Sequence, residues 1–476
     1  MQYSYRQLAE RISAEIERGH YRPGARLPSL RSVSEQHSVS ISTALRCYRY
    51  LETRGVVEAR AKSGMYVADR GRVDLRLPVT AVVARAPVAY DKLVSLQHRL
   101  TELYSLTEQD LPLALHLASA APDWYPCAAL AEIARRQLQR HPTRLGQYPT
   151  GTGWPALKQV LLKHLGDCGV DLQPAELLIT NGSTEALSVA LRAVAQAGET
   201  VIVESPVYFG LLQMLENLGL RALEIPCTVA GGLSLEALEY ALEHHEGVRA
   251  MVVMPAFQNP LGSAMSDKNK KRLLRLAEQY DISVIEDDVF GDITPHQERP
   301  TPLKAWDRQG RVIYCGSCSK SVAPAYRLGW VAGGRHHSRI VSLKLSHSLV
   351  TPWFEQVVLA EFLQSGALYS HLRKLRERLA ANIARAVTVV AHSFPRGSTL
   401  VSTAGGWWLW LELPPTIDCL ALLRRAVAEG IAFTPGIVFS HTSKYAHCLR
   451  LNIARPWSAE LERGIVRLGE LAQQFV

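Results

Sequence analysis

The side chain with the clearest chemical potential is a lysine set among small residues. Lys320 lies in the stretch Ser317-Cys-Ser-Lys-Ser, and Arg327 follows seven positions later. A lysine amine that is partly neutral condenses with aldehydes, and hydroxyls beside a guanidinium bind phosphate. Most lysine–arginine pairs of this kind are solvated charges on a surface loop. The stretch therefore predicts either an exposed loop or a site for a phosphorylated aldehyde.

A second group of polar residues follows the apolar run LLIT at 177–180. Asn181, Gly182, Ser183 and Thr184 come next, and a helical pattern begins there. Gly182 permits a sharp turn, and a helix N-terminus presents free N–H groups to an anion beside the two hydroxyls. The same residues are equally expected as ordinary capping groups. By itself this segment does not separate a phosphate site from a capped helix.

Three further apolar runs end at residues suited to a flat heterocyclic ring. Tyr208 offers an aromatic face for stacking. Asn259 precedes a proline, which keeps it out of helical conformation and leaves its amide free to bond a phenolic oxygen. Asp287 ends an apolar run, where a buried carboxylate is costly unless it meets a cation such as a protonated pyridine.

Together these groups match one ligand, pyridoxal phosphate (PLP). Lys320 suits its aldehyde, and Ser317, Ser319 and Arg327 can join Ser183 and Thr184 around its phosphate. We therefore predict that the protein binds PLP. Cys315 and Cys318 form a lone C-x-x-C pair beside the lysine. Without a second such pair or a histidine pair, a zinc or redox role has little support, and no metal site is predicted.

The elements that must position these residues alternate along the chain. Strands are predicted at 177–180, 200–204, 249–254, 282–287, 311–316 and 328–333, and helices at 184–196, 207–218 and 267–280. Such alternation is typical of a mainly parallel sheet covered on both faces. Ligands in these sheets bind at the carboxyl ends of the strands. The sheet is therefore expected to bring the residues above into one site.

The body of the chain resembles the fold-type I aminotransferases from about residue 112 to 476. The motifs that carry the resemblance are Tyr148-Pro-Thr-Gly-x-Gly, Asn181-Gly-Ser-Thr-Glu-Ala-Leu, Ser205-Pro-x-Tyr208, Gln258-Asn259-Pro-x-Gly262, Glu286-Asp287-Asp288, Ser317-x-Ser-Lys320 with Arg327-Leu-Gly-Trp330, and Leu449-Arg450-Leu-Asn452. The resemblance implies a large domain with a mainly parallel sheet and a small C-terminal domain.

The resemblance also implies a role for each matched residue. Lys320 would form the internal aldimine, Asp287 would pair with the pyridine nitrogen, Asn259 would bind the ring oxygen, and Tyr208 would stack on the ring. Gly182, Ser183, Thr184, Ser317, Ser319 and Arg327 would hold the phosphate, which Tyr148 would reach from the other subunit of a dimer. Arg450 would receive a substrate or effector carboxylate as a bidentate fork.

Two features near Asp287 qualify this assignment of roles. Asp288 is an alternative partner for the ring nitrogen. The family usually has a tyrosine two or three places beyond the aspartate, where this chain has Val289 and Phe290. Loss of that hydroxyl is expected to change the proton balance of the aldimine and to slow transamination, without preventing cofactor binding.

The first 70 residues predict a winged helix-turn-helix. Helical patterns run between Ser4 and Gly19, after Ser29, and between Ser40 and Gly55, and a hairpin follows around Ala61–Gly64. The third helix would read DNA. The candidate DNA contacts are Arg31, Ser40, Ser42, Thr43, Arg46, Lys62 and Gly64. A helical protein–protein module is the alternative for this segment.

This N-terminal segment resembles the GntR-family DNA-binding domain. The shared positions are Tyr5, Gly19, Pro23-Gly24, Leu27-Pro28-Ser29, Arg31, Val39-Ser40, Thr43, Tyr48, Leu51, Gly55 and Ser63-Gly64-x-Tyr66-Val67. That family binds operators as dimers. Ile41 and Leu45 stand where family members often have an arginine. Direct base readout is therefore expected to depend mainly on Arg31, Arg46 and the wing.

A GntR-like head on an aminotransferase-like body resembles the MocR subfamily of bacterial regulators. The expected division is a DNA-binding domain at 1–68, a linker with one helix near 91–107 at 69–110, and the PLP-binding effector and dimerisation domain at 111–476, with its small subdomain at about 350–476. The resemblance implies head-to-tail homodimers, and PLP or an amino compound as effector.

Composition is compatible with this organisation. The chain has 476 residues, 47% hydrophobic and 20% charged, with eight scattered cysteines and a net charge of +9. Residues 1–75 contain 13 Lys and Arg against 8 Asp and Glu, a surplus that suits a polyanionic partner. No apolar run is long enough for a membrane span, and the N-terminus lacks the pattern of a secretory signal. A reducing bacterial cytoplasm is the expected location.

Three functions fit these predictions to different degrees. The first is a PLP-dependent transcriptional regulator that senses PLP or an amino compound through Lys320. The second is a working aminotransferase with an accessory DNA-binding head, which the presence of Lys320 and Arg450 keeps open. The third, a DNA-binding protein whose body serves only to dimerise, does not explain a complete set of cofactor residues. The missing tyrosine and the intact winged helix favour the regulator.

Overall fold

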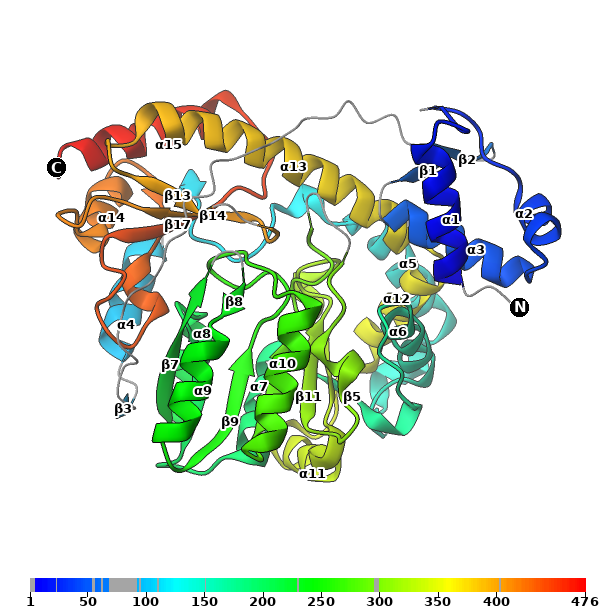
Figure 1. Cartoon of the computed structure of the whole chain (residues 1–476), viewed down its shortest axis with the longest axis horizontal. Helices are drawn as coiled ribbons and strands as arrows, with labels where there is room; N and C mark the ends of the chain where they lie inside the picture. The colour runs from blue at the N-terminus through cyan, green and yellow to red at the C-terminus, as the bar shows by residue number, and fades with distance from the viewer. Residues whose placement is uncertain are drawn as a thin grey trace.

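The computed structural model describes residues 5–22, 24–53, 56–60, 63–67, 92–93, 96–108, 111–149, 151–228, 231–294, 299–401 and 404–476. Its elements form a small N-terminal head, a large α/β domain and a C-terminal α/β layer (Figure 1). Within those ranges, no helix has the length and apolar character needed to cross a bilayer.

The large domain is built on one nine-stranded sheet. Its order is β3-β7-β6-β9-β10-β11-β12-β5, with β8 paired to β7. The strands are β3 (Lys92–Leu93), β5 (Leu177–Thr180), β6 (Thr200–Ser205), β7 (Arg221–Thr228), β8 (Gly232–Leu233), β9 (Val248–Val253), β10 (Ser283–Asp287), β11 (Val312–Ser317) and β12 (Gly329–Ala332). Strands β7, β6, β9, β10 and β11 run parallel to one another, which confirms the mainly parallel sheet.

The register of this sheet brings the predicted residues to one edge. Strands β6, β10 and β11 end at Ser205, Asp287 and Ser317. Strand β12 is antiparallel to both β11 and β5, so its first residue, Gly329, lies opposite Ser317 on one side and Thr180 on the other. The start of β12, which directly follows Arg327, therefore shares the edge where the other strands end.

Helices cover the sheet on both faces. In Figure 1, α9 and α10 lie in front of the sheet, and α7 packs against β10, β11 and β12 from behind. The helices of this domain are α5 (Cys127–Arg140), α6 (Pro155–Asp167), α7 (Gly182–Val194), α8 (Phe209–Asn217), α9 (Leu235–His244), α10 (Asp267–Gln279), α11 (His337–Ser348) and α12 (Trp353–Gln364). The strands are buried on both faces and therefore read as continuous apolar runs.

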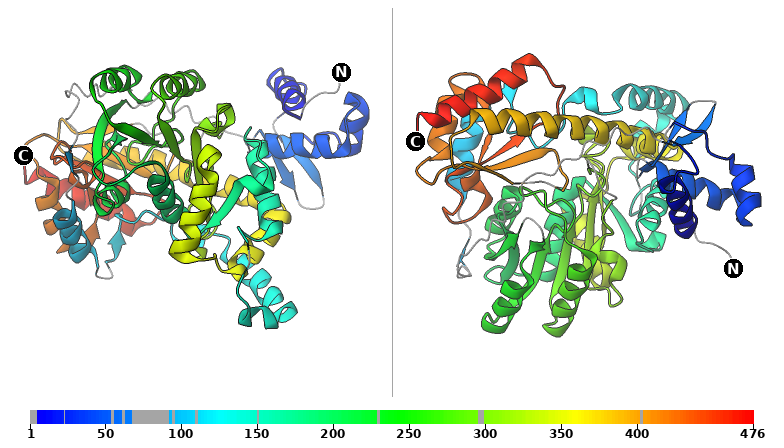
Figure 2. Two further views of the ribbon diagram at one scale, coloured as in Figure 1. Left: turned by 90° about the horizontal axis from the view of Figure 1, so that it is seen from below. Right: turned by 45° about the horizontal axis from the view of Figure 1, so that its top comes forward.

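The C-terminal layer is a four-stranded sheet with helices on it. Its order is β13-β14-β17-β16, from Thr399–Val401, Trp408–Glu412, Cys448–Asn452 and Thr434–Pro435. The helices are α13 (Ala367–Ser393), α14 (Cys419–Val427) and α15 (Ala459–Gln473), and β15 (Ile431–Ala432) pairs with β4 (Leu113–Ala114). Helix α13 has 27 residues, about 40 Å, and runs from this layer to the head (Figures 1 and 2).

The head has the predicted winged helix-turn-helix arrangement and a hydrophobic core of its own. Helices α1 (Tyr5–Glu17), α2 (Leu30–His37) and α3 (Ile41–Thr53) precede the two-stranded wing of β1 (Val57–Arg60) and β2 (Gly64–Val67). Ser29 and Ser40 cap α2 and α3, because the Ser32 and Thr43 N–H groups donate to their hydroxyls.

Only part of the predicted linker is described. Residues 92–93 form the edge strand β3 beside β7, and the expected helix near 91–107 is present as α4 (Gln97–Thr107). Arg99 of α4 donates to the carbonyls of Ile437, Ser440 and Thr442, so this helix is docked on the body. The domain boundaries within 69–110 stay a prediction.

Candidate functional site

Lys320 lies just beyond the end of β11, in a setting that favours its neutral form. Its Nζ donates a hydrogen bond of 2.7 Å to the Ala118 carbonyl and lies 5.7 Å from the centroid of the Phe290 ring. Burial lowers the pKa of this amine to about 8, and the charges of Arg450 and Arg327 act in the same direction. A useful fraction of the amine is therefore neutral and nucleophilic near physiological pH.

Asp287 is the carboxylate left free for a ring nitrogen. It is the last residue of β10 and is 7% exposed, and its Oδ1 accepts only a 3.3 Å hydrogen bond from the Val289 N–H among the described groups. Burial raises its pKa to about 7, with Asp288 adding to the rise and Lys320 opposing it. A cation placed against this carboxylate would stabilise its ionised form.

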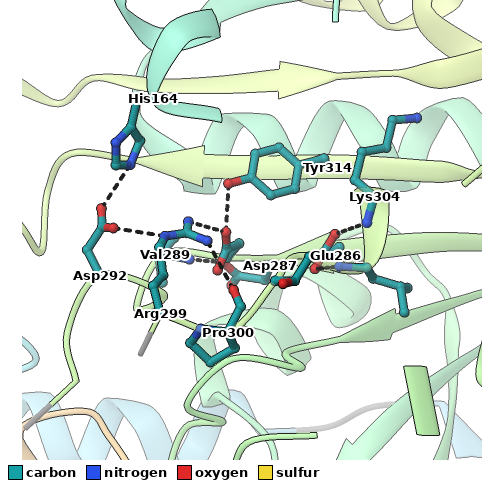
Figure 3. Close-up of polar contacts among 12 residues, drawn as sticks. His164, Glu286, Asp287, Val289, Asp292, Arg299, Pro300, Lys304 and Tyr314 are labelled. Carbon is teal, nitrogen blue, oxygen red and sulfur yellow. Dashed lines mark hydrogen bonds and ion pairs between the residues drawn. The ribbon is translucent and has the colours of Figure 1, made fainter. Parts of the chain in front are cut away.

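Asp288, the alternative partner, is already occupied on the other side of the strand. Its Oδ2 accepts hydrogen bonds of 2.7 Å from Arg299 Nη2 and 2.7 Å from the Tyr314 hydroxyl (Figure 3). Arg299 in turn donates to Asp292 over 2.9 Å. These bonds occupy Oδ2 of Asp288 and leave its Oδ1 without a described partner, whereas Asp287 has no described ion pair, so Asp287 is the better candidate for the ring nitrogen.

The predicted phosphate ligands form a compact cluster of donors. Ser317 Oγ bonds Ser319 Oγ at 2.9 Å, and Arg327 Nη1 donates to Ser319 Oγ at 3.3 Å. Gly182, at φ +80°, opens α7, and a Cβ there would lie 2.6 Å from Arg327 Nη2. Ser183 follows in the first turn of α7. The bare glycine, a guanidinium and a helix N-terminus make a cradle that suits a dianionic phosphate.

Arg450 is a buried cation that lies beside Asn259. Only 1% of it is exposed, and Nη1 donates 2.8 Å to Asn259 Oδ1, while Nη2 donates to the His116 carbonyl and to Thr434 Oγ1. All these acceptors are neutral, and no described carboxylate pairs with the guanidinium, whose Nε has no partner among the described atoms. Burial lowers its pKa to about 10. A carboxylate from a bound ligand would give the buried guanidinium the negative partner that it lacks among the described residues.

The positions after Asp287 confirm the departure noted in the sequence. Val289 and Phe290 are both buried, and the Phe290 ring packs edge-on against Trp408 and Trp407 with centroids 4.6 and 5.6 Å apart. Phe290, which stands where the family usually has the tyrosine, therefore packs into a hydrophobic cluster with the two tryptophans. Asn259 is left as the described side chain suited to the ring oxygen.

Tyr208 and Tyr148 have different surroundings. Tyr208 follows β6, and burial raises its pKa, with Asp287 as the next largest contribution. It is therefore near the carboxylate that would face a ring.

Tyr148 is 84% exposed and lines a surface cavity of about 650 Å³ that includes no other predicted cofactor residue of this chain. A contact from Tyr148 to a second subunit's site stays a prediction.

These observations fit PLP. The site holds an amine with a lowered pKa, a free carboxylate, a donor-rich cradle and an amide, each on the edge where the strands of the large sheet end. The computed structure carries no ligand, so the roles of the individual residues follow from their chemistry and position.

The predicted DNA contacts lie on exposed parts of the head. Arg31, Ser40 and Ser42 are exposed, and the Ser40 hydroxyl bonds those of Ser42 and Thr43 at 2.8 Å each. Gly64, at φ +119°, begins β2 of the wing. Lys62 lies outside the described residues.

Arg46 has a position that the sequence did not indicate. Its Nη2 lies 2.7 Å from Asp167 Oδ1 of the body, and its guanidinium lies 4.6 Å from the Tyr5 ring centroid. A phosphate contact by Arg46 would therefore require this ion pair to open.

Several groups around the site had no signal in the sequence. The carbonyls of Ala118 and His116 accept from Lys320 and Arg450, and a backbone carbonyl leaves no trace in residue type. Thr434 and Arg299 are ordinary residues in the sequence, and only the fold brings them to Arg450 and Asp288.

Comparison with known proteins identifies both parts of the chain. The family model described as "Aminotransferase class I and II" matches residues 115–468, and that described as "Bacterial regulatory proteins, gntR family" matches residues 4–67. The chain is 34% identical to the Escherichia coli "Uncharacterized HTH-type transcriptional regulator YjiR" over 98% of both chains. It is 29% identical to the "Probable rhizopine catabolism regulatory protein MocR" of Rhizobium meliloti, over 90% of this chain and 86% of that one.

A solved structure agrees with the fold of the body. Pyrococcus horikoshii kynurenine aminotransferase, solved in complex with PMP, superposes with a TM-score of 0.73 and 30% identity over 79% of this chain and 94% of its own. The fold of the body is therefore that of the fold-type I aminotransferases, as predicted, and the matching family implies PLP as the cofactor.

Proposed function

Because the chain belongs to the aminotransferase class I and II family and carries a gntR-family regulatory domain at its N-terminus, we propose that it is a transcriptional regulator that senses PLP, or an amino compound, at Lys320. The observation that carries the sensing role is Arg450, a buried cation whose described partners are all neutral and which lies beside the predicted ring-binding Asn259. A site with a reactive amine and an unpaired guanidinium suits a ligand with an amine and a carboxylate.

Different residues of the chain are suited to different parts of the cofactor and of the ligand. PLP supplies an aldehyde that condenses with primary amines and a ring nitrogen that can be protonated. Lys320 would provide the first amine, and Asp287 would pair with the protonated ring nitrogen. Ser183, Thr184, Ser317, Ser319 and Arg327 would hold the phosphate, Tyr208 would stack on the ring, and Asn259 would donate to its oxygen.

The ligand side of the site is expected to select for a carboxylate. Arg450 offers a planar fork of donors whose burial makes an anionic partner valuable. An incoming amine would displace Lys320, while Arg450 would bind the carboxylate of the same molecule. Since Arg450 belongs to β17 and Lys320 follows β11, such a ligand would connect the C-terminal layer to the large domain.

The proposal is tested by comparing amino acids with the amines made from them by decarboxylation. Purified protein loaded with PLP should show a visible absorption band that shifts as the ligand displaces Lys320. We expect an amino acid that shifts the band to do so at a far lower concentration than the amine made from it. Arg450→Met should remove this difference, and the band itself should remain. Equal responses to acid and amine in the wild type would contradict the role of Arg450. Absence of a visible band would contradict the role of Lys320.

DNA is the partner that the gntR-family domain implies. We propose that two heads of a homodimer bind an operator in the bacterial cytoplasm through Arg31, Ser40, Ser42, Thr43, Lys62 and Gly64, and that Tyr148 reaches the partner's phosphate in a head-to-tail dimer. Footprinting on the gene's own upstream DNA tests the first part. Cross-linking through Tyr148→Cys to the partner subunit tests the second.

A working aminotransferase is the second candidate, favoured by one observation. Lys320 and Asp287 lie at the edge of the large sheet, Arg450 of β17 lies beside Asn259, and transamination needs the same three groups. The two functions differ in turnover. Release of the 2-oxo acid over many cycles, with a second 2-oxo acid present to accept the amino group and without any DNA binding at moderate salt, would favour the enzyme. DNA binding that responds to the amino acid, with little 2-oxo acid released, would favour the regulator.

A further inference from the structure

The head and the body enclose a small cavity where they meet. Helices α1 and α3 of the head lie beside the near end of α13, as Figure 1 shows from one direction and Figure 2 from two others. The cavity has a volume of about 80 Å³. That is room for roughly five water molecules, or for one tetrahedral oxyanion. We call it the seam cavity, and its charged lining consists of Arg6, Arg46, Arg49, Arg299, Arg376, Asp167 and Asp292.

Positive side chains outnumber negative ones in the described lining of the seam cavity. Five arginines face two aspartates, a surplus of three positive charges. Asp288 lies behind Arg299 and accepts from it at 2.7 Å, which still leaves a surplus of two. Like charges gathered around one small volume repel one another, and an anion bound among them would relieve that repulsion.

The aspartate on the inner side of the cavity is already neutralised by the body. Asp292 Oδ1 accepts from Arg299 Nε at 2.9 Å, and its Oδ2 lies 3.4 Å from His164 Nε2 (Figure 3). Burial opposes the charge of Asp292, yet His164 and Arg299 hold its pKa well below the usual range. Its negative charge therefore does not serve the arginines that come from the head.

The other aspartate serves those arginines only in part. The Asp167 carboxylate accepts from Arg46 Nη2 at 2.7 Å and from the Tyr369 hydroxyl at 3.3 Å. Arg6 Nη2 donates at 2.9 Å to the backbone carbonyl of Asp167, which is a neutral acceptor. The Nε of Arg46 is buried and has no partner among the described atoms. One carboxylate is thus shared by two guanidinium groups whose donors are incompletely used.

Arg49 is the least satisfied of the head's arginines at this cavity. It is partly buried, and none of its N–H groups donates to a described acceptor. Its guanidinium lies 5.6 Å from the centroid of the Tyr369 ring, and a Cβ on Gly366 would lie 3.1 Å from its Nη2. A planar fork of unused donors on the wall of a cavity suits the oxygens of an anion.

The arrangement of the arginines favours a phosphoryl group over a carboxylate. Arg6 comes from α1, Arg46 and Arg49 come from α3, and Arg376 comes from α13. A carboxylate is planar and is matched by a single guanidinium fork. A phosphate monoester has three terminal oxygens that point in different directions and carries about two negative charges near neutral pH. It therefore matches both the directions and the charge of this lining.

We propose that the seam cavity is a second ligand site, which binds the phosphoryl group of a small molecule through Arg49, with Arg6 and Arg46 beside it. The site is separate from the cofactor edge and needs no PLP, so the inference goes beyond the proposed function. Asp167 competes with the ligand, because it pairs with Arg46 and adds negative charge to the lining. Free phosphate and a phosphate ester present the same chemistry to these arginines.

Calorimetric titration of the full-length protein with inorganic phosphate tests the site. The cradle at Arg327 is also suited to phosphate, so the titrated proteins all carry Arg327→Met and are free of PLP. In that background we expect one phosphate per chain, and we expect Arg49→Met to weaken its binding at least tenfold. Arg275→Met, at an exposed position of α10, is the matched control and should stay within twofold. Equal affinities in Arg49→Met and Arg275→Met would overturn the site.

Two further variants separate recognition of phosphate from damage to the fold. Arg49→Lys keeps the charge and loses the fork, so its affinity should lie between those of the parent and Arg49→Met. Asp167→Asn removes the competing charge, and we expect phosphate to bind at least threefold tighter. A disrupted contact between head and body would weaken binding instead, so weaker binding in Asp167→Asn would overturn the proposed role of the lining.

The class of the ligand is tested by comparing anions at constant ionic strength. Glycerol 3-phosphate that binds at least as tightly as inorganic phosphate would assign the site to a phosphate ester, and preference for inorganic phosphate would assign it to the free ion. Acetate that binds as tightly as either would overturn the choice of a phosphoryl group.

A duplex without operator sequence tests whether these arginines serve DNA instead. We expect the duplex to leave phosphate binding in the Arg327→Met background unchanged. Displacement of phosphate by the duplex, with duplex affinity also reduced in Arg49→Met, would assign Arg49 to the DNA backbone and overturn a site for a small molecule. Failure of the wild type to bind PLP would contradict the proposed function and leave every one of these comparisons decisive.

Discussion

The cofactor edge and the DNA-binding head place their functional groups in opposite ways. Asp287, Asn259 and Arg450 are buried on strands or loops held by a nine-stranded sheet and a four-stranded sheet. Ser40, Ser42 and Arg31 are exposed on short helices over a small separate core. Chemistry at the first site depends on fixed distances and low polarity. Reading at the second depends on exposed side chains that can reach DNA.

The largest expected effect concerns the buried cofactor site. Lys320→Ala removes the amine that joins PLP, so the visible band of protein loaded with PLP in the absence of amino acid should disappear. The head does not contact Lys320, so its thermal unfolding is expected to be unchanged. Lys271→Ala, on the exposed side of α10, is the control and should retain the band. A band of wild-type intensity in Lys320→Ala would assign the attachment to another lysine.

The next effect tests the choice between the two adjacent carboxylates. Asp287→Asn leaves a ring cation without its counter-charge, and breaking such a buried pair costs about 3–5 kcal/mol, a loss of roughly 100-fold or more in PLP affinity. Equilibrium dialysis against PLP measures this directly. Asp288→Asn should weaken binding far less, because Asp288 is bound to Arg299 and Tyr314. A larger loss in Asp288→Asn would reverse the assignment.

The head should respond to a core substitution without affecting the body. Leu51 is fully buried in the head's own core. Leu51→Ala is expected to cost about 2–5 kcal/mol, from lost burial and the cavity left behind. Calorimetry should show a head transition at lower temperature and a body transition that does not move. PLP binding should be unchanged, and a parallel loss of PLP affinity would mean that the two regions unfold together.

The sequence predicted the body better than it predicted the contact between the two regions. Strand β5 was predicted at its observed residues 177–180, and the other predicted strands differ from the structure by one or two residues. Strand β7 was not predicted, since Glu224 and Pro226 interrupt its apolar pattern. Burial of Glu224 is possible because Ser205 and Ser440 donate to it, a compensation that only the fold supplies.

For the candidate site, too, the sequence predicted individual residues but not their partners. Lys320, Asp287, Asn259 and Arg450 were found because each stands at a strand end or in a motif with a chemical reason. The partners that tune them could not be found, because the carbonyl of Ala118 is invisible in residue type and Arg299 is one arginine among many. For Arg46 the helix position suggested DNA, and its pairing with Asp167, 121 positions away, depends on the docking of two separate cores.

The pH dependence of PLP attachment follows from the pKa of Lys320, about 8. Only the neutral amine attacks the aldehyde, and burial lowers the pKa, so the neutral fraction is larger than in an exposed lysine. Below pH 8 this fraction falls about tenfold per pH unit, so the rate of attachment should rise from pH 6 to 8 and then level off. Stopped-flow absorbance measures it. A plateau reached only near pH 10 would mean that the amine is not desolvated in solution.

The smallest expected effect lies at the exposed end of α3. Ser40 caps this helix, since the Thr43 N–H donates to its hydroxyl at 3.1 Å, and Ser40→Ala is expected to cost the head about 1 kcal/mol. Ser42 bonds the Ser40 hydroxyl but caps nothing among the described groups, so Ser42→Ala should change the stability by a few tenths at most.

If both hydroxyls also contact DNA, the two variants should distinguish an effect on the stability of the head from an effect on its affinity for DNA. Ser42→Ala would then weaken operator binding at nearly constant stability, whereas Ser40→Ala would reduce both together. Denaturation of the head and anisotropy on the operator, measured on the same samples, resolve the two effects. Unchanged DNA affinity in Ser42→Ala would confine these hydroxyls to capping, and the reading would have to come from Arg31 and the wing.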